Sequence, residues 1–276
     1  MAEFFLTALG AASSTLKVAE SSRSMFSKMD MILRYLKQGN VRVIIFGAGG
    51  TGKSTLEQVL IGNESKLIPD YQESLTIEKS KMKGDVIGSF LTAPGQENRI
   101  AKDWGELYAM LKDNKVKGII NVVSYGYHSV PFSLNNFQNH PLYETGMNKE
   151  DFLMLYCKKQ RGREIELLER LKTRLIDTPK KIWMLTLVTK QDLWWSQREE
   201  VKKHYLESRY NKIIQEIVYE KGNQNFHHEY LSASLIINNF RMGNEMMLKT
   251  VEGYDRVVQL LHLNQLVNTV GSYIRQ

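Results

Sequence analysis

The chain has 276 residues, which is long for one small α/β domain and short for two. Hydrophobic residues make up 42% and charged residues 24%, which is ordinary for a soluble globular protein. Its single cysteine, Cys157, excludes a disulfide within the chain and a cysteine-based zinc cluster, which fits a reducing compartment. The net charge of +7 permits contact with an anionic membrane or nucleic acid, but the interleaved basic and aromatic residues of RNA-binding modules are missing.

Residues 1–40 precede the first predicted strand. Apolar residues recur there at helical spacing, at Met25, Phe26, Met29, Ile32, Leu33 and Leu36. The spacing predicts an amphipathic helix, while polar interruptions from Ser13 onward make the segment too broken to span a membrane. Two interpretations stay open. The helix packs on the core or on a second copy of the chain, or it attaches the protein to a partner or a membrane surface, for which Phe4 and Phe5 are suited.

The core begins with an apolar, β-branched run at 41–46, which predicts a buried parallel strand. The next eight residues fit the phosphate-binding pattern G-x-x-x-x-G-K-[ST] without a mismatch: Gly47, Ala48, Gly49, Gly50, Thr51, Gly52, Lys53 and Ser54. The glycines allow a tight turn whose N–H groups face phosphate oxygens. Lys53 adds positive charge near the β- and γ-phosphates, and Ser54 offers a hydroxyl to Mg²⁺. Thr55 follows at the start of a predicted helix, whose positive dipole end would favour the phosphates.

Three further segments continue the α/β pattern. Strand-like runs at 77–82 and 86–91 surround a Gly-Asp turn signal and predict a hairpin, and another buried strand is predicted at 116–123. Residues 127–160 resemble an insertion that lies near the carboxyl ends of the strands, where ligands bind in α/β sheets. Its His128 and His140 lack the close spacing of metal ligands.

A leucine stripe within 161–181 predicts a helix on the face of the sheet, preceded by Cys157 as a buried structural thiol. The apolar run 181–188 predicts another buried strand. Trp194 and Trp195 follow it closely. Because adjacent tryptophans cannot share one buried helix face, we expect one of them to cover a bound base or to pack on the helix below, and the other to contact a partner.

Thr189-Lys190-Gln191-Asp192 follows that last strand and resembles [NT]-K-x-D, the guanine-reading motif of the Ras-like GTPase superfamily. The Asp192 carboxylate can accept hydrogen bonds from guanine N1–H and the exocyclic amine, which adenine cannot supply. The Lys190 stem would lie along the base. Ser232-Ala233 is similar to the S-A-x loop of the superfamily, which implies that the Ala233 N–H reaches guanine O6.

Residues 91–97 resemble the D-x-x-G-Q-E motif of the same superfamily. The resemblance implies that the Gly95 N–H contacts the γ-phosphate, that Gln96 orients the attacking water and that Thr76 ligates Mg²⁺ in the first switch. Thr92 replaces the aspartate that holds an Mg²⁺-bound water in the superfamily, and it brings no charge. The resulting T-x-P-G-Q form resembles that of bacterial and archaeal MglA-type small GTPases.

The sequence thus predicts a three-layer α/β P-loop NTPase of the Ras-like G-domain type, with a mostly parallel sheet and one antiparallel edge strand. An N-terminal helical extension (1–40) would precede a GTPase domain (41–276) with an insertion at about 127–160. The expected activity is slow, Mg²⁺-dependent hydrolysis of GTP to GDP and phosphate by a molecular switch. Lys53 and Gln96 would be catalytic, and Ser54 and Thr76 would ligate the metal.

The expected partners are an effector of the GTP state and a GTPase-activating protein, and no nucleic acid is indicated. A dimer and attachment to a membrane surface stay open for this otherwise cytoplasmic protein. Two alternatives remain for the activity. Thr92 is compatible with a GTP-binding interaction scaffold with little or no hydrolysis. An ATP-dependent P-loop protein is the other alternative, although no acidic strand end of Walker B type follows the P-loop.

Overall fold

The computed structural model describes residues 41–60, 78–79, 89–92, 100–113, 116–129 and 137–275. The helix predicted within 1–40 and the hairpin turn predicted between the runs 77–82 and 86–91 lie outside these residues, as does part of the predicted insertion.

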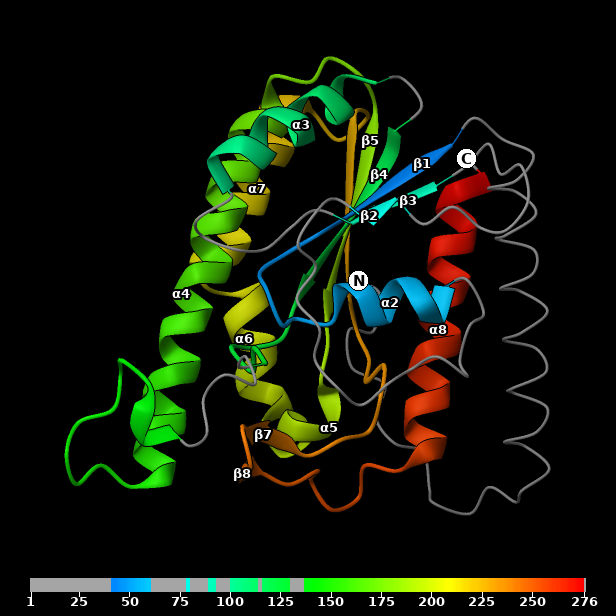
Figure 1. The fold of residues 1–276 in the computed structure, drawn as a ribbon. Coiled ribbons are helices and arrows are strands. Elements are labelled where there is room, and N and C mark those ends of the chain that lie inside the picture. The colour runs from blue at the N-terminus through cyan, green and yellow to red at the C-terminus, as the bar shows by residue number, and fades with distance from the viewer. Residues whose placement is uncertain are drawn as a thin grey trace.

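A six-stranded sheet forms the middle layer, with the strand order β2-β3-β1-β4-β5-β6 (Figure 1). Strands β3, β1, β4, β5 and β6 are parallel, and the edge strand β2 pairs antiparallel with β3. The prediction of a mostly parallel sheet with one antiparallel edge strand is therefore confirmed. The strands are β1 (Arg42–Phe46), β2 (Glu78–Lys79), β3 (Ser89–Thr92), β4 (Val116–Val123), β5 (Ile182–Val188) and β6 (Phe226–Ser232).

Helices cover both faces of the sheet, which gives the three predicted layers (Figure 1). One face carries α2 (Lys53–Leu60) and α8 (Arg256–Arg275), and the other carries α3 (Ile100–Lys112), α4 (Lys149–Ile176), α6 (Arg198–Leu206) and α7 (Arg209–Lys221). Because both faces are covered, the inner strands β1 and β5 are almost continuously apolar. Among the described residues, no helix combines the length and the apolar character needed to cross a membrane.

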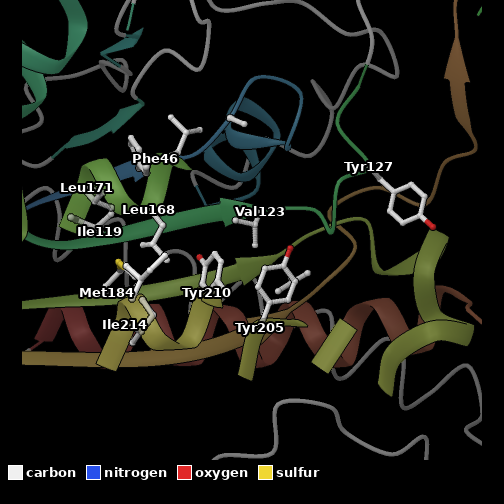
Figure 2. Close-up of a cluster of buried hydrophobic side chains, with 14 of the residues drawn as sticks. Phe46, Ile119, Val123, Tyr127, Leu168, Leu171, Met184, Tyr205, Tyr210 and Ile214 are labelled. Carbon is white, nitrogen blue, oxygen red and sulfur yellow. The ribbon is translucent and has the colours of Figure 1, made fainter. Parts of the chain in front are cut away.

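Alternate residues of β1, β4 and β5 enter two separate cores, as the pleat of a strand requires. On β1, Ile44 packs toward α4 and α7, whereas Val43 packs toward α2 and α8. Figure 2 shows the first core, where Ile119 and Met184 of the sheet lie near Leu168 of α4.

Helix α4 is longer than the predicted helix within 161–181, because it starts at Lys149 and ends at Ile176. Asn148 caps its first turn by accepting a hydrogen bond from the Asp151 N–H, and Glu150 and Asp151 complement the helix dipole. The final residues of the predicted 127–160 insertion therefore form the first turns of this helix. The polar sequence between Lys158 and Arg163 had hidden its periodicity.

Both tryptophans are buried, so the alternative of packing within the chain is confirmed and the expectation that one of them contacts a partner is wrong. The chain passes from α5 (Gln191–Trp194) to a short 3-10 turn η4 (Trp195–Gln197) between them, and the two rings pack against different neighbours. Trp194 lies in the core under α4 and donates its indole N–H to Thr189 O at 2.7 Å. Trp195 packs edge-on against Tyr254 and His262.

Two elements lie outside the main sheet pattern. A 3-10 turn, η3 (Phe137–Asn139), precedes α4, and a two-stranded antiparallel sheet is made by β7 (Phe240–Met242) and β8 (Glu245–Leu248). The β7–β8 hairpin lies beside α5, at the carboxyl end of β5 (Figure 1). The Val251 N–H after β8 donates to Asp192 O at 2.8 Å, which ties this segment to the T-K-x-D motif.

Candidate nucleotide-binding site

The phosphate-binding pattern forms the loop between β1 and α2, and its glycines allow close packing. Gly47 has φ 141°, and a Cβ there would lie 2.1 Å from Val122 O. Gly50 has φ 74°, and a Cβ there would lie 2.6 Å from Ser129 N. A side chain fits neither position, so glycine is required at both. The loop, with Gly49 and Gly52 in it, therefore lies directly against the end of β4 and the residues after it.

Lys53 begins α2 and is buried, with Nζ donating to Ala48 O at 2.7 Å. Thr51 Oγ1 donates to the same carbonyl at 2.9 Å. The ammonium group thus lies across its own loop, close to where the pattern places phosphate oxygens. Ser54 and Thr55 follow in the first turn of α2.

Thr189 joins the P-loop to the T-K-x-D motif, which lie far apart in the sequence. Its hydroxyl donates to Thr51 O in the P-loop at 2.6 Å and lies 3.0 Å from Val123 O. Its N–H donates to Val123 O at 2.8 Å. Because Thr189 is buried, this contact fixes the start of the T-K-x-D motif against the P-loop.

Lys190 has a left-handed backbone, with φ 56°, and its side chain turns toward the residues after β4. Its Nζ donates to Tyr127 O and to Ser129 Oγ, the latter at 3.0 Å. Burial lowers the pKa of Lys190 to about 8, although the negative charges of Asp192 and Glu164 oppose this shift. The Ser129 N–H in turn donates to Gly50 O at 3.1 Å, so Lys190 and the P-loop share one supporting segment.

Asp192, the predicted base-reading residue, is 1% exposed. Its carboxylate accepts hydrogen bonds from Ser234 Oγ, from Asn238 N at 3.0 Å and from Thr250 Oγ1 at 3.2 Å. Burial raises the pKa of Asp192, and these hydrogen bonds oppose the rise. The carboxylate is therefore already satisfied within the chain, and a base would have to replace some of these donors.

Ser232 and Ala233 lie next to this carboxylate but bond elsewhere. Ser232 Oγ accepts from Gln191 Nε2 at 2.9 Å, and the Ala233 N–H donates to Val188 O at 3.1 Å. The serine that contacts Asp192 is Ser234, two residues later. Ser234 belongs to the same Ser-Ala-Ser run, so the run itself was a sequence signal for a residue that contacts Asp192.

Several predicted site residues lie outside the described part of the chain: Thr76, Gly95 and Gln96. Thr92 is the last residue of β3, and its backbone lies in register with Ile45 of β1. Ile45 is followed by Phe46, the last residue of β1, and then by the P-loop. The roles assigned to these four residues stay predictions. In the described ranges no group of three His, Cys, Asp or Glu side chains is arranged to hold a metal, and a magnesium site built from hydroxyls and phosphates would not need one.

The remaining histidines have ordinary neighbours. His140 packs edge-on against Phe152 and Tyr156. His227 lies beside the Tyr273 ring of α8, while His228 bonds Thr186 Oγ1 at 2.9 Å, so the two adjacent side chains diverge.

Cys157 is buried, and burial raises the pKa of its thiol to about 12. The prediction of a buried thiol is confirmed, and this thiol is a poor nucleophile.

No protein-family model matches the chain, and no curated protein matches it. Among solved structures it is similar to the small COPII coat GTPase SAR1 from Encephalitozoon cuniculi in complex with GDP, at 10% identity over 94% of this chain and 91% of that one, with a TM-score of 0.43. Toc33 from Arabidopsis thaliana in complex with Mg²⁺ and GMPPNP matches at 12% identity over 94% and 93%, with a TM-score of 0.44. A probable GTP-binding protein engB matches at 14% identity over 85% and 99%, with a TM-score of 0.43.

All three identities are low and all three TM-scores lie below one half. These likenesses therefore lend no weight to a family or an activity. The fold is assigned from the strand order of this chain, and its function is inferred from its own contacts.

Proposed function

We propose that the protein binds guanine nucleotides with Mg²⁺ and hydrolyses GTP slowly to GDP and phosphate, as a molecular switch. The hydrogen bond from Thr189 to Thr51 O supports this most strongly. It places a complete P-loop and a T-K-x-D motif at the same edge of the sheet, the edge where ligands bind in parallel α/β folds. One nucleotide could contact the first motif through its phosphates and the second through its base.

The residues of the P-loop fit the phosphates. Backbone N–H groups of the glycine loop and the N-terminal end of α2 would face them. Lys53 would exchange its bond to Ala48 O for a phosphate oxygen, and Ser54 would supply a hydroxyl ligand to Mg²⁺. When bound, Mg²⁺ supplies charge neutralisation between the β- and γ-phosphates. Thr76 would be the second protein ligand, and Gln96 would orient the attacking water beside the Gly95 N–H.

Base recognition in this proposal is an exchange of partners at Asp192. Guanine N1–H and its exocyclic amine would replace the Asn238 N–H and the Thr250 hydroxyl, while Ser234 keeps its place. The exchange requires the segment between β6 and α8 to move aside. An adenine base offers no matching pair of donors and would leave the buried carboxylate without compensation.

Thr92 favours a second candidate, a GTP-binding scaffold with little turnover, because it lacks the charge that would hold an Mg²⁺-bound water. The resemblance of the T-x-P-G-Q form to that of MglA-type small GTPases rests on Thr92 as well, and membership of that subgroup is likewise proposed. Both candidates imply an effector that binds one nucleotide state. A GTPase-activating protein, a dimer and membrane attachment through the N-terminal helix stay proposals.

Binding and turnover of GTP beside ATP, with and without Mg²⁺, test the proposal. We expect tight GTP binding with slow Mg²⁺-dependent phosphate release, both lost in Lys53→Ala and unchanged in Lys203→Ala, an exposed lysine of α6. Tight binding without release would favour the scaffold. A preference for ATP would favour the ATP-dependent alternative and contradict the proposal.

A further inference from the structure

A buried carboxylate lies outside the P-loop and the T-K-x-D motif. Glu164, in the middle of α4, is 2% exposed. It accepts hydrogen bonds from Ser124 N at 2.9 Å, Gly126 N at 3.3 Å, His128 Nε2 at 2.9 Å and Tyr205 OH at 2.7 Å. Three of these four donors come from the loop 124–129, which directly follows β4.

The charge state of this cluster follows from its surroundings. Burial alone would raise the pKa of Glu164, but the hydrogen bonds from His128, Ser124 and Tyr205 outweigh it, and the pKa lies below its usual value. Burial lowers the pKa of His128, so its ring is neutral at pH 7 and donates Nε2–H. A buried anion without these donors would be costly, so its ionised state and the conformation of the loop depend on each other.

Two more contacts hold the outer side of the loop. The Tyr125 N–H donates to Tyr205 OH at 2.9 Å, and Tyr156 OH donates to His128 O at 2.7 Å. Tyr205 therefore connects the loop backbone to Glu164 through one hydroxyl. The loop is thus fixed to α4 and α6 at Ser124, Tyr125, Gly126 and His128.

The inner side of the same loop supports the candidate site. The Ser129 N–H donates to Gly50 O in the P-loop at 3.1 Å, and Lys190 Nζ donates to Tyr127 O and Ser129 Oγ. Residues of the loop 124–129 thus alternate between Glu164 on one side and the P-loop and Lys190 on the other.

We infer that Glu164 is a positioning residue for nucleotide binding, an inference that rests on the proposed function. Its carboxylate holds the loop 124–129 in the one arrangement that lets Tyr127 and Ser129 contact Lys190 and Gly50. Glu164 itself touches neither the phosphates nor the base. Without its hydrogen bonds, the P-loop and Lys190 lose a shared support, and bound nucleotide dissociates faster.

The test compares two substitutions of nearly equal size. Glu164→Met fills the same space without a hydrogen-bond acceptor, whereas Glu164→Gln keeps one acceptor oxygen for Ser124 and His128. Affinity and dissociation rate are measured with a fluorescent GDP derivative in the presence of Mg²⁺. The folded fraction of each variant, measured by circular dichroism at the same temperature, corrects its apparent affinity, because a partly unfolded protein binds more weakly in proportion.

Controls separate positioning from fold stability. Leu171→Ala shortens a buried side chain of α4 about two helical turns beyond Glu164, and Tyr210→Phe removes a buried hydroxyl that bonds Asn121 instead of Glu164. Tyr205→Phe removes the hydroxyl that does bond Glu164. This variant tests the inference in place of Glu164→Met if Glu164→Met does not fold.

After correction, we expect Glu164→Met to weaken GDP binding at least about tenfold, with faster dissociation, and Tyr205→Phe to weaken it several-fold. Glu164→Gln should recover most of the affinity, and both controls should bind as the wild type does. Wild-type affinity in Glu164→Met and Tyr205→Phe would overturn the inference and leave Glu164 a stabilising residue only.

The nucleotide that the wild-type protein binds distinguishes failure of the inference about Glu164 from failure of the proposed function. If it binds ADP instead of GDP, the proposed function is wrong, and the same variants titrated with ADP still test Glu164, because the loop contacts the P-loop as well as Lys190. If it binds neither nucleotide, both the function and the inference fall.

Discussion

The hydroxyl of Thr189 donates a hydrogen bond to the carbonyl oxygen of Thr51 at 2.6 Å, across 138 positions of the chain. Both residues are buried, so water cannot replace the bond if it is lost. It fixes the distance between the loop that would hold phosphates and the carboxylate that would read a base. A nucleotide that spans both would bind more weakly if this distance varied.

Removing that hydroxyl should therefore weaken nucleotide binding. Thr189→Val keeps the shape of the side chain but leaves Thr51 O without this donor, a loss on the order of 1 kcal/mol or more. We expect GDP affinity to fall about tenfold, while Thr189→Ser, which keeps the hydroxyl, stays close to the wild type. Titration with a fluorescent GDP derivative measures both. Equal affinity in the valine and serine variants would contradict a role for this bond.

Gly50 should tolerate no side chain. A Cβ there would lie 2.6 Å from Ser129 N and 2.7 Å from Ser129 O, and the positive φ adds strain. We expect Gly50→Ala to lower the free energy of unfolding by about 1–3 kcal/mol, measured by urea titration. Gly162 in α4 is the control, because a Cβ there meets nothing within 4 Å. Gly162→Ala should raise stability by up to about 1 kcal/mol, because alanine favours a helix more than glycine does.

Thr250 should act against guanine binding in the free protein. Its hydroxyl donates to Asp192 at 3.2 Å, and in the proposed exchange a guanine donor must displace it. Thr250→Val removes this competitor, so GDP affinity should rise about threefold, whereas Thr250→Ser should leave it unchanged. Calorimetric titration of the three proteins distinguishes these outcomes. Weaker binding in Thr250→Val alone would mean that Thr250 supports Asp192 in the bound state.

Protein stability should decrease in mild acid, in part through His228. Burial, with a smaller contribution from His227, lowers the pKa of His228 to about 3, below its ordinary value of 6.5. The neutral ring of such a histidine favours the folded state fully at pH values above the pKa that histidine has in the unfolded chain. This contribution to stability is lost as the pH falls from that value toward the lower pKa of the folded state. Stability should therefore fall below pH 6.5 by up to about 1.4 kcal/mol per pH unit from this group.

His128, His140, His204 and His262 have lowered pKa values as well, so they add to the same trend. His228→Gln keeps a partner for Thr186 without titrating, and it should flatten the decline measured by urea unfolding between pH 7.5 and 4.5. His227→Gln, at an exposed position, should follow the wild type much more closely than His228→Gln does, because His227 makes only the smaller contribution to the lowered pKa of His228. Parallel curves for wild type and His228→Gln would show that His228 does not titrate as described.

The elements that the sequence predicted best are those with a local signal. The β4 and β5 strands are mostly apolar runs, and the P-loop is fixed by Gly47 and Gly50, whose positions admit no side chain. The positions that the sequence missed depend on distant chain segments. Asn238 and Thr250 reach Asp192 only because the β7–β8 hairpin folds back over α5, and neither has a distinctive sequence context.

Glu164 shows the same limit within one helix. It lies among charged residues of α4, and in the sequence nothing separates it from exposed neighbours such as Glu166. Only the passage of the loop 124–129 beneath it, opposite Tyr205, makes its carboxylate a buried anion. The prediction of a partner contact for one of the two tryptophans failed for a related reason. Spacing alone does not predict that the chain changes from α5 to a 3-10 turn between Trp194 and Trp195.

The central claim is that Asp192 reads a guanine base, and the most direct test exchanges its acceptor for a donor. Asp192→Asn places an amide N–H where guanine offers its exocyclic amine, a mismatch, but where xanthine offers a carbonyl oxygen, a match. Competition between GDP and XDP should favour GDP in the wild type, and in Asp192→Asn it should favour XDP, with the ratio changed by a factor on the order of 100. An unchanged ratio would contradict base reading by Asp192 and leave its carboxylate a structural partner of Ser234, Asn238 and Thr250.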